Sequence, residues 1–377
     1  MRLLLLIGSA LLFALGLVMV YNTTSAEILD RLLEKNTHHA LFRQLLYAFL
    51  GGGLAILVWR VGYLPLLKLS PLLLIGLTLL LVLVFVPGVG KVRNGAHRWI
   101  GFGGLTLQPS EFVKYLIPFV YIEWFSRREG KEVGFFSFGK IVALLACPMF
   151  LVMIEPDNGT TAVIGATLIP LFFLTKIRFT YWALPVLLLL AVGSLAAFQL
   201  PYVRGRLEVY LHPELDPQGK GHQPHQAKIA AGSGKFLGRG PGGSLQKLTY
   251  LPEAQNDYIA AIFAEEFGFL GVLVLILLYM LWTYGGMAIA FQAPTNQATL
   301  LAATITFLLS LQAFLNLGVV SGLLPSKGVN LPFFSQGGTS LIANMAGLGL
   351  LLSIHEKKDH ISRKRDGGSP LPSPSSS

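Results

Sequence analysis

The chain has 377 residues, of which 53% are hydrophobic and 13% charged, and its mean hydropathy is +0.62. Soluble domains carry about 25% charged residues, so this composition indicates an integral membrane protein. The formal net charge of +10 favours anionic headgroups or a phosphorylated lipid as partners and not nucleic acid, because no nucleic-acid recognition module is visible. Cys147 is the single cysteine, which excludes a disulfide framework and a cysteine zinc site.

Apolar runs long enough to cross a bilayer, about 17 to 25 residues each, recur along the chain. We expect about ten, at residues 3–21, 41–59, 69–87, 108–125, 138–155, 159–175, 179–199, 258–283, 298–323 and 338–355. They predict an all-α integral membrane protein with about ten transmembrane helices over residues 1–355. A large loop, about 200–257, separates helices 7 and 8. The tail, 356–377, is basic and then rich in Ser and Pro, which predicts disorder.

Basic residues in the short loops predict the orientation. With ten spans, one side of the membrane receives Arg60, Lys68, Arg127, Arg128, Lys131, Lys176, Arg178 and the basic tail. Short basic loops stay in the cytoplasm. Both termini are therefore predicted to be cytoplasmic, and the long loop extracytoplasmic.

Three outward-facing segments hold most of the unusual polar residues. The first, residues 94–114, includes Arg98 and ends in Glu111 and Lys114. The i,i+3 spacing of this acid and this lysine places both on one face of the helix that enters the membrane. The two residues form either a structural ion pair or a direct contact with substrate, and the sequence leaves both readings open.

The second outward segment is the long loop, which carries Arg204, Arg206 and further basic residues. Its glycine-rich stretch, residues 232–243, does not satisfy the Walker pattern for a phosphate-binding loop. Two readings remain for this stretch. It is either a backbone cradle for phosphate oxygens or a flexible linker.

The third segment, residues 322–340, has Pro and Gly residues that interrupt the helical pattern, which predicts a broken or re-entrant element lining a cavity. Lys327 would point a cation into that cavity. Asp257 precedes an apolar helix that also carries Glu265 and Glu266. The helical period places Glu265 below Asp257, about 12 Å deeper at 1.5 Å per residue, and Glu266 almost opposite. Carboxylates this close to a bilayer usually mark function.

Several motifs, in order, resemble those of the SEDS family (shape, elongation, division and sporulation) over nearly the whole membrane portion. They are Gln-Pro-Ser-Glu-Phe-Val-Lys at 108–114, Glu-Pro-Asp-Asn-Gly-Thr at 155–160, Leu-Pro-Glu-Ala-Gln-Asn-Asp-Tyr-Ile at 251–259, Ala-Glu-Glu-Phe-Gly-Phe-Leu-Gly at 264–271 and Pro-Phe-Phe-Ser-Gln-Gly-Gly-Thr-Ser at 332–340. The stretches 244–253 and 324–328 look more like the division branch, FtsW, than the elongation branch, RodA.

The resemblance implies a peptidoglycan glycosyltransferase of the bacterial cytoplasmic membrane, which polymerises lipid II into undecaprenyl-linked glycan strands on the outer face. It implies an essential aspartate, here Asp257. Gln255, Asn256 and Tyr258 stand where the family usually has His, Thr and Phe, and Gln336 where Tyr is usual, so these positions are not assigned catalytic roles. The implied partners are a class B penicillin-binding transpeptidase and other proteins of the division or elongation complex.

The chemistry of such a reaction agrees with one carboxylate among cations. A base takes the proton of the attacking sugar hydroxyl, and a lipid diphosphate leaves as an anion that cations stabilise. We expect Asp257 to be that base. Supporting or substrate-binding roles are expected for Glu111, Lys114, Arg98, Arg204, Arg206, Lys327 and Ser335, whereas Asp157, Gln226, Glu265 and Glu266 are structural or unassigned. No organic cofactor is expected, and a divalent cation, Mg²⁺ or Mn²⁺, is a further candidate beside the diphosphate.

Two other functions compete with this prediction. Ionisable groups in the membrane and broken helices also suit a lipid II flippase, but the polar groups cluster at the outer ends of the spans and not near the midplane. A non-catalytic scaffold of the division machinery would account for the spans but not for outward cations beside a single carboxylate. The enzyme is therefore the preferred prediction.

Overall fold

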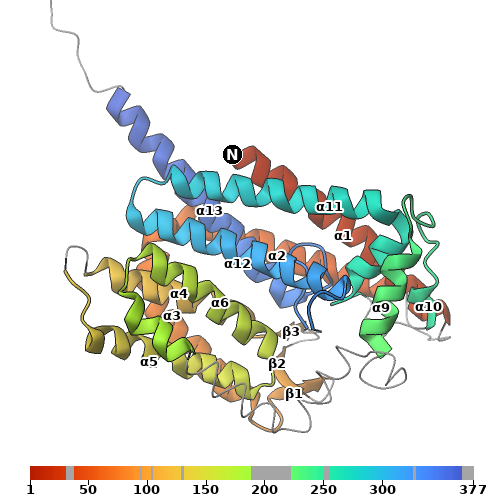
Figure 1. Cartoon of the computed structure of the whole chain (residues 1–377), viewed down its shortest axis with the longest axis horizontal. Coiled ribbons are helices and arrows are strands. Elements are labelled where there is room, and N and C mark those ends of the chain that lie inside the picture. The colour runs from red at the N-terminus through yellow and green to blue at the C-terminus, as the bar shows by residue number, and fades with distance from the viewer. Residues whose placement is uncertain are drawn as a thin grey trace, which may run out of the picture.

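The computed structural model of the chain is a bundle of long helices, with a small sheet and several short helices gathered at one end (Figure 1). It describes residues 1–30, 38–93, 96–102, 105–128, 131–187, 222–249, 255–325 and 328–366. The N-terminus of α1 and the C-terminal end of α13 both lie away from the end that carries β1, β2, α9 and α10. This arrangement agrees with both termini lying on one side of the membrane.

Most helices follow the predicted apolar runs, but two short ones, α9 and α10, lie within the predicted loop. In chain order they are α1 (Arg2–Asp30), α2 (His39–Val61), α3 (Tyr63–Val84), α4 (Ser110–Ser126), α5 (Phe135–Ile154), α6 (Asn158–Leu174), α9 (His222–Ser233), α10 (Gln246–Thr249), α11 (Ile259–Phe291), α12 (Asn296–Val320) and α13 (Gly338–Asp366). Among the described residues, seven helices are long and apolar enough to cross a membrane, and α6 is a shorter apolar helix.

The remaining predicted spans are accounted for by shorter helices. The helix α4 has 17 residues and carries three charged side chains, and residues 179–187 are helical where the seventh span was predicted. The predicted fold class, a helical protein with about ten spans, is therefore confirmed. The helix α13 continues to Asp366, so residues 356–366 are helical where disorder was predicted for the whole tail, 356–377. Residues 367–377 lie outside the described part of the chain.

One boundary differs from the prediction in a way that matters for the loops. The helices α2 and α3 are separated by Gly62 alone, which has φ +83°, and Lys68 lies inside α3 instead of in an inner loop. Pro65 does not prevent this, because a proline in the first turn of a helix removes no helical hydrogen bond.

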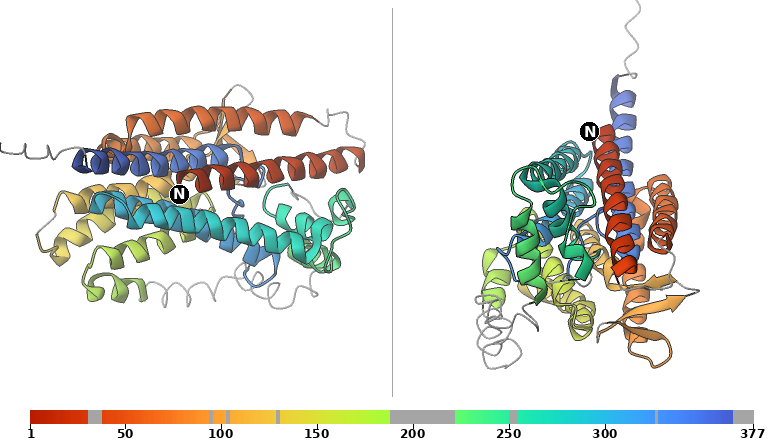
Figure 2. Two further views of the ribbon diagram at one scale, coloured as in Figure 1. Left: turned by 90° about the horizontal axis from the view of Figure 1, so that it is seen from above. Right: turned by 90° about the vertical axis from the view of Figure 1, so that its right-hand side faces the viewer.

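A three-stranded antiparallel sheet lies between α3 and α4 and was not predicted. Its strands, β1 (Gly90–Arg93), β2 (Ala96–Phe102) and β3 (Leu105–Leu107), pair in the order β1-β2-β3. In the right-hand view of Figure 2 its strands lie at the lower right, beside the helices. Because paired strands fix the direction of alternate side chains, the sheet gives Arg98 a defined position beside the helices.

The helix α11 is broken at Gly268, which has φ 64° and ψ −162°. The glycine-rich stretch packs against this break, with the amides of Arg239 and Gly240 donating to the carbonyls of Glu265 and Glu266 at 3.0 and 2.9 Å. A Cβ at Gly268 would lie 2.3 Å from the Gly238 nitrogen. The stretch is therefore a packed structural element. The reading as a flexible linker is wrong, and these two amides are occupied by carbonyls instead of phosphate.

The predicted broken element between α12 and α13 is confirmed. Residues 321–337 are not helical where they are described, yet Leu331 and Phe334 are buried. A Cβ at Gly16 of α1 would lie 2.3 Å from the Phe334 carbonyl oxygen, so this glycine allows α1 to lie directly against the element. Buried non-helical backbone at this position is tolerated because it lines a cavity, and that cavity is the candidate site.

Candidate functional site

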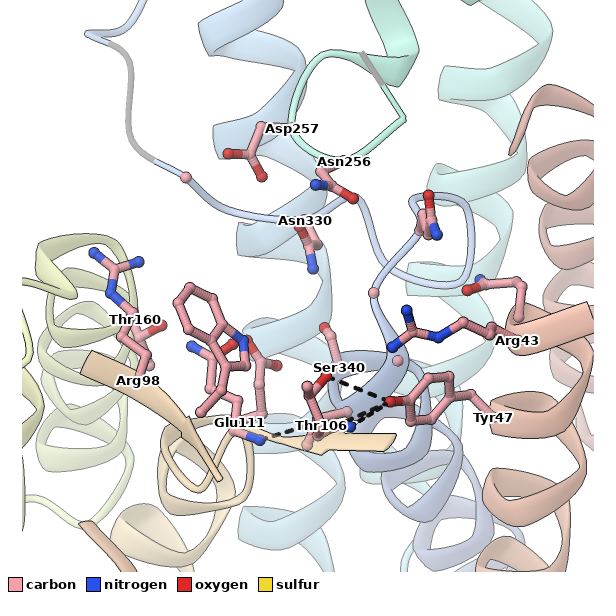
Figure 3. A pocket seen from close by; sticks show the side chains of 18 of the residues that line it. Arg43, Tyr47, Arg98, Thr106, Glu111, Thr160, Asn256, Asp257, Asn330 and Ser340 are labelled. Atoms are coloured by element: carbon pink, nitrogen blue, oxygen red, sulfur yellow. Dashed lines mark hydrogen bonds between the residues drawn. The ribbon is translucent and has the colours of Figure 1, made fainter. Parts of the chain in front are cut away.

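A polar pocket of about 250 Å³ lies where the sheet, the broken element and the segment before α11 meet (Figure 3). Its walls come from five parts of the chain that are distant in sequence. The lining residues are Arg43, Gln44, Tyr47, Ala96, Arg98, Trp99, Thr106, Gln108, Glu111, Thr160, Asn256, Asp257, Gly328, Asn330, Gln336, Gly337, Gly338, Thr339 and Ser340. Three of the predicted site residues, Asp257, Glu111 and Arg98, are thus brought together.

The position of Asp257 is fixed by its main chain. The buried side-chain amide of Asn316 on α12 donates to the carbonyl oxygens of Asp257 and Val329, both at 2.8 Å. A Cβ at Gly328 would lie 3.0 Å from one carboxylate oxygen of Asp257. The carboxylate is half-buried and lines the pocket, so it can reach both solvent and a bound substrate.

Glu111 and Lys114 form the predicted ion pair. The Lys114 Nζ lies 2.5 Å from the Glu111 Oε2, and the side chain of Lys114 is completely buried. Both residues belong to α4, and of the two only Glu111 lines the pocket. The geometry favours the structural reading of the pair, in which Lys114 holds the Glu111 carboxylate at the pocket wall.

We expect alanine at Glu111 or at Lys114 to remove most of the activity, because a buried charge without its partner costs about 3–5 kcal/mol. The charge-swapped double variant Glu111→Lys/Lys114→Glu should restore the thermal midpoint and much of the activity if the pair is structural. The thermal midpoint and the activity are both measured on purified protein. A well-folded double variant that stays inactive would instead indicate direct contact with substrate.

Arg98 lies at the pocket wall and is held mainly by main-chain carbonyls. Its Nε donates to the carbonyl of Glu155 at 3.0 Å and its Nη2 to that of Pro156 at 2.6 Å, while its Nη1 is 4.0 Å from Asp157 Oδ1. These contacts join β2 to the α5–α6 connection. They also fix the guanidinium on the side of the pocket shared with Thr160 (Figure 3).

Asp157 acts as a local structural centre. It is the N-cap of α6, where its Oδ1 accepts from the amide of Thr160 at 3.2 Å, and its Oδ2 accepts from Gln108 Nε2 at 3.1 Å and Ser110 Oγ at 3.3 Å. Side-chain N-caps of this kind satisfy amides that have no helical partner. These contacts favour a structural role for Asp157, which the sequence left as structural or unassigned.

Glu155, directly after α5, is buried, and neither carboxylate oxygen has a hydrogen-bond partner among the described residues. Burial and the nearby Asp157 charge raise the pKa of Glu155 to about 8, against an opposing effect of Arg98. In the unfolded chain the pKa is about 4.3. Between these two pKa values the folded state binds more protons than the unfolded state. Glu155 therefore lowers the free energy of unfolding as pH rises, by at most about 1.4 kcal/mol per pH unit.

We therefore expect Glu155→Gln to raise the thermal midpoint at pH 8 by several degrees while changing it little at pH 4.5. The midpoint is measured by intrinsic fluorescence between pH 4.5 and 8. The matched control is Glu132→Gln, because the Glu132 side chain is 96% exposed. An equal effect of both substitutions at every pH would contradict the assignment.

The helix α2 supplies pocket residues that the sequence did not reveal. Arg43, Gln44 and Tyr47 line the pocket; Tyr47 Oη accepts from the amide of Thr106 at 2.9 Å, and Gln44 Nε2 donates to the carbonyl of Ser335 at 3.3 Å. Polar side chains at i, i+1 and i+4 in an otherwise apolar run were the available signal, because they share one face of a helix.

Other predicted site residues lie elsewhere. The Ser335 hydroxyl accepts from the amide of Leu331 at 2.9 Å inside the broken element, and Gln226 lies on α9; neither lines the pocket. Arg204, Arg206 and Lys327 lie outside the described residues.

Glu265 and Glu266 belong to a separate buried cluster. The Lys247 Nζ is 2.8 Å from Glu266 Oε1 and 2.7 Å from Asn22 Oδ1, and Ser244 Oγ donates to Glu265 Oε2 at 2.5 Å. Both acids thus face the chain before Asp257. The prediction counted the helical period from Asp257, whereas α11 begins at Ile259 and Tyr258 is not helical. The expected contrast between the two acids is not observed, because both contact residues 244–247.

The described residues contain no group of three or more His, Cys, Asp and Glu side chains placed to hold a metal ion. A divalent cation therefore stays a prediction for this site.

The fold and the pocket together define a multi-pass membrane protein with a polar site at one end of its helical bundle. The family model described as cell cycle protein, covering FtsW, RodA and SpoVE, matches residues 2–360. The chain therefore belongs to the FtsW/RodA/SpoVE family.

Named relatives match over nearly their whole length. A probable peptidoglycan glycosyltransferase FtsW of Legionella pneumophila is 38% identical over 94% of this chain and 91% of its own. The stage V sporulation protein E of Bacillus subtilis is 37% identical over 93% and 96%. The crystal structure of the rod shape determining protein RodA of Thermus thermophilus superposes with a TM-score of 0.68 at 27% identity, covering 94% and 96%.

A further solved structure concerns the coordination of polymerization and crosslinking by a peptidoglycan synthase complex. One of its chains matches with a TM-score of 0.77 at 28% identity and covers 94% of this chain and 97% of its own. The resemblance stated from the sequence motifs is thus confirmed at the level of the family and of the fold.

Proposed function

We propose that this chain is a peptidoglycan glycosyltransferase that polymerises lipid II into glycan strands at the outer face of the cytoplasmic membrane. The observation that carries the proposal is the half-buried Asp257 carboxylate in a polar pocket that Arg43 and Arg98 also line. One base and several cations are the groups that transfer from a lipid diphosphate requires. The names of the matched relatives support the same reaction.

In the proposed reaction a sugar hydroxyl of one substrate attacks the anomeric carbon of another. Asp257 takes the proton from that hydroxyl as the new C–O bond forms. The bond between the anomeric carbon and the diphosphate breaks, and the lipid diphosphate leaves with the electron pair. Direct displacement inverts an α-linked donor to a β-linked product. Glycosidases need a second carboxyl group to protonate the leaving oxygen, whereas a diphosphate leaves as an anion and needs none.

The rival function, transport of lipid II, is less well supported by the geometry. A transporter site is expected near the membrane midplane between helices, whereas this pocket is lined by the sheet and by residues in the first turns of α2, α4, α6 and α13. A scaffold function does not account for a carboxylate facing a polar cavity.

The test is polymerisation by purified protein. Labelled lipid II is incubated with the chain, with and without a class B penicillin-binding transpeptidase, and the products are separated by size. We expect glycan strands that depend on the chain. Strands that appear equally with the transpeptidase alone would overturn the proposal.

The partners and the biological setting follow from the same proposal. A class B transpeptidase is the proposed partner, since one matched structure is described as a peptidoglycan synthase complex. The division role is favoured over the elongation role by the FtsW relatives. Mg²⁺ or Mn²⁺ is proposed as an aid to departure of the diphosphate, and the role of Asp257 as base does not depend on it.

The orientation has its own test, since lipid II is polymerised where its sugars lie. Single cysteines at Ser233 and Ser373, in a Cys147→Ser background, are treated with a membrane-impermeant maleimide on intact cells whose outer membrane is permeabilised. We expect labelling at position 233 and none at 373. The opposite pattern would place Asp257 on the cytoplasmic side and exclude the proposed reaction.

A further inference from the structure

The helix α13 begins at the pocket wall. Its first main-chain hydrogen bond runs from the amide of Leu341 to the carbonyl of Gly337, at 2.8 Å. The amides of residues 338–340 therefore precede the hydrogen-bonded ladder, and all three residues line the pocket. Such amides carry partial positive charge and bind anions when they face a cavity.

Ser340 adds an independent indication of a ligand. Its side chain is 94% buried, with 6% exposed, yet it lines the pocket, and its hydroxyl has no hydrogen-bond partner among the described residues. The neighbouring hydroxyl of Thr339 is fully used, because it accepts from the amide of Gln108 at 3.1 Å and donates to the carbonyl of Thr106 at 3.0 Å. The Ser340 hydroxyl is not among the fully buried side-chain atoms without a partner, so it reaches the pocket and is available to a bound group.

Arg43 supplies the charge. It lies one helical turn before Tyr47 on α2, and a Cβ at Gly338 would lie 2.4 Å from the Tyr47 ring, so the two helices touch at this point. No ion pair or hydrogen bond holds the Arg43 guanidinium within the described ranges. Arg98, in contrast, is already held by two carbonyls.

We propose that Arg43, the Ser340 hydroxyl and the first amides of α13 form the subsite that binds the diphosphate of the lipid-linked donor. The proposal rests on the proposed function and assigns the leaving group a place. Figure 3 shows Asp257 and Arg43 on different walls of the pocket. An inverting displacement needs the base and the leaving group on opposite sides of the reacting carbon, so the anomeric carbon of a donor bound at Arg43 would have to lie between Arg43 and Asp257.

The test measures binding and not turnover. The full chain is placed in lipid nanodiscs, and the affinities for undecaprenyl diphosphate and undecaprenyl monophosphate are measured by native mass spectrometry. We expect Arg43→Gln to weaken diphosphate binding about tenfold or more, because a charge-assisted contact is lost, and Ser340→Ala to weaken it severalfold. Arg43→Lys should have a smaller effect. The control, Arg60→Gln, removes an exposed arginine near the other end of the same helix.

The two ligands also report on folding, since they share the lipid chain and differ by one phosphate. Loss of diphosphate binding with retained monophosphate binding supports the subsite in a folded protein. Unchanged diphosphate binding in both Arg43→Gln and Ser340→Ala overturns it, even if lipid II is polymerised normally. If the wild-type chain polymerises no lipid II but binds diphosphate through Arg43, the proposed function fails while the subsite stands.

Discussion

Asp257→Asn is expected to abolish lipid II polymerisation while the protein still folds and inserts. Asparagine has almost the same shape as aspartate but cannot accept a proton from the attacking hydroxyl. Removing a general base typically costs about 10²–10⁴ in rate. The main chain at this position should not move, because the Asn316 amide bonds to the carbonyl of residue 257 and not to its side chain.

The measurement is the rate of strand formation from labelled lipid II at several pH values. Asp257→Glu is the matched variant, because it keeps the carboxylate but displaces it, and we expect a small residual rate. Retained binding of undecaprenyl diphosphate by Asp257→Asn would show that the pocket is intact. Near-normal synthesis by the asparagine variant would refute the assignment of the base.

Lys247→Met is expected to cost about as much stability as any single substitution in this chain. The Lys247 ammonium is buried between Glu266, Asn22 and the carbonyl of Gly242, at 2.7–2.8 Å. Its removal leaves the Glu266 carboxylate, which is 1% exposed, without a counter-charge. Breaking such a buried pair costs about 3–5 kcal/mol. The residues before Asp257 would also lose an attachment to α1 and α11, so activity should fall together with stability.

The double variant Lys247→Met/Glu266→Gln separates charge from packing. A glutamine still hydrogen-bonds with Asn22 but needs no cation, so we expect the thermal midpoint to recover most of the loss. The control is Lys235→Met, since no ion pair of Lys235 is recorded in the described part of the chain. A double variant as unstable as the single one would indicate that the shape of the cluster, and not its charge, is decisive.

The sequence predicted the helices well because a membrane span is a long local pattern. Span lengths are set by bilayer thickness, and the apolar runs reproduced α5, α6 and α12 to within about three residues. The sheet was missed because its strands, such as Ala96–Phe102, are short and mix Gly, Trp and charged residues. Strand pairing over such lengths is decided by neighbours and not by intrinsic preference.

The candidate site was predicted only in part. Motif resemblance pointed to Asp257, Glu111 and Arg98, and all three line the pocket. Arg43 and Ser340 were missed because their importance comes from the contact between α2 and α13, which are about 300 residues apart. The relation of Glu265 to Asp257 was missed for a different reason. The helical period was counted from Asp257, but α11 begins only at Ile259, so the period does not extend to Asp257.

The two hydrogen bonds donated by the Asn316 amide also affect how the pocket can open. The Asn316 side chain ties the Asp257 segment to the segment that leads into α13. These two walls of the pocket should therefore move together. The sheet with Arg98 forms another wall of the pocket. Opening or closing of the pocket would therefore require movement between the sheet and these two tied segments.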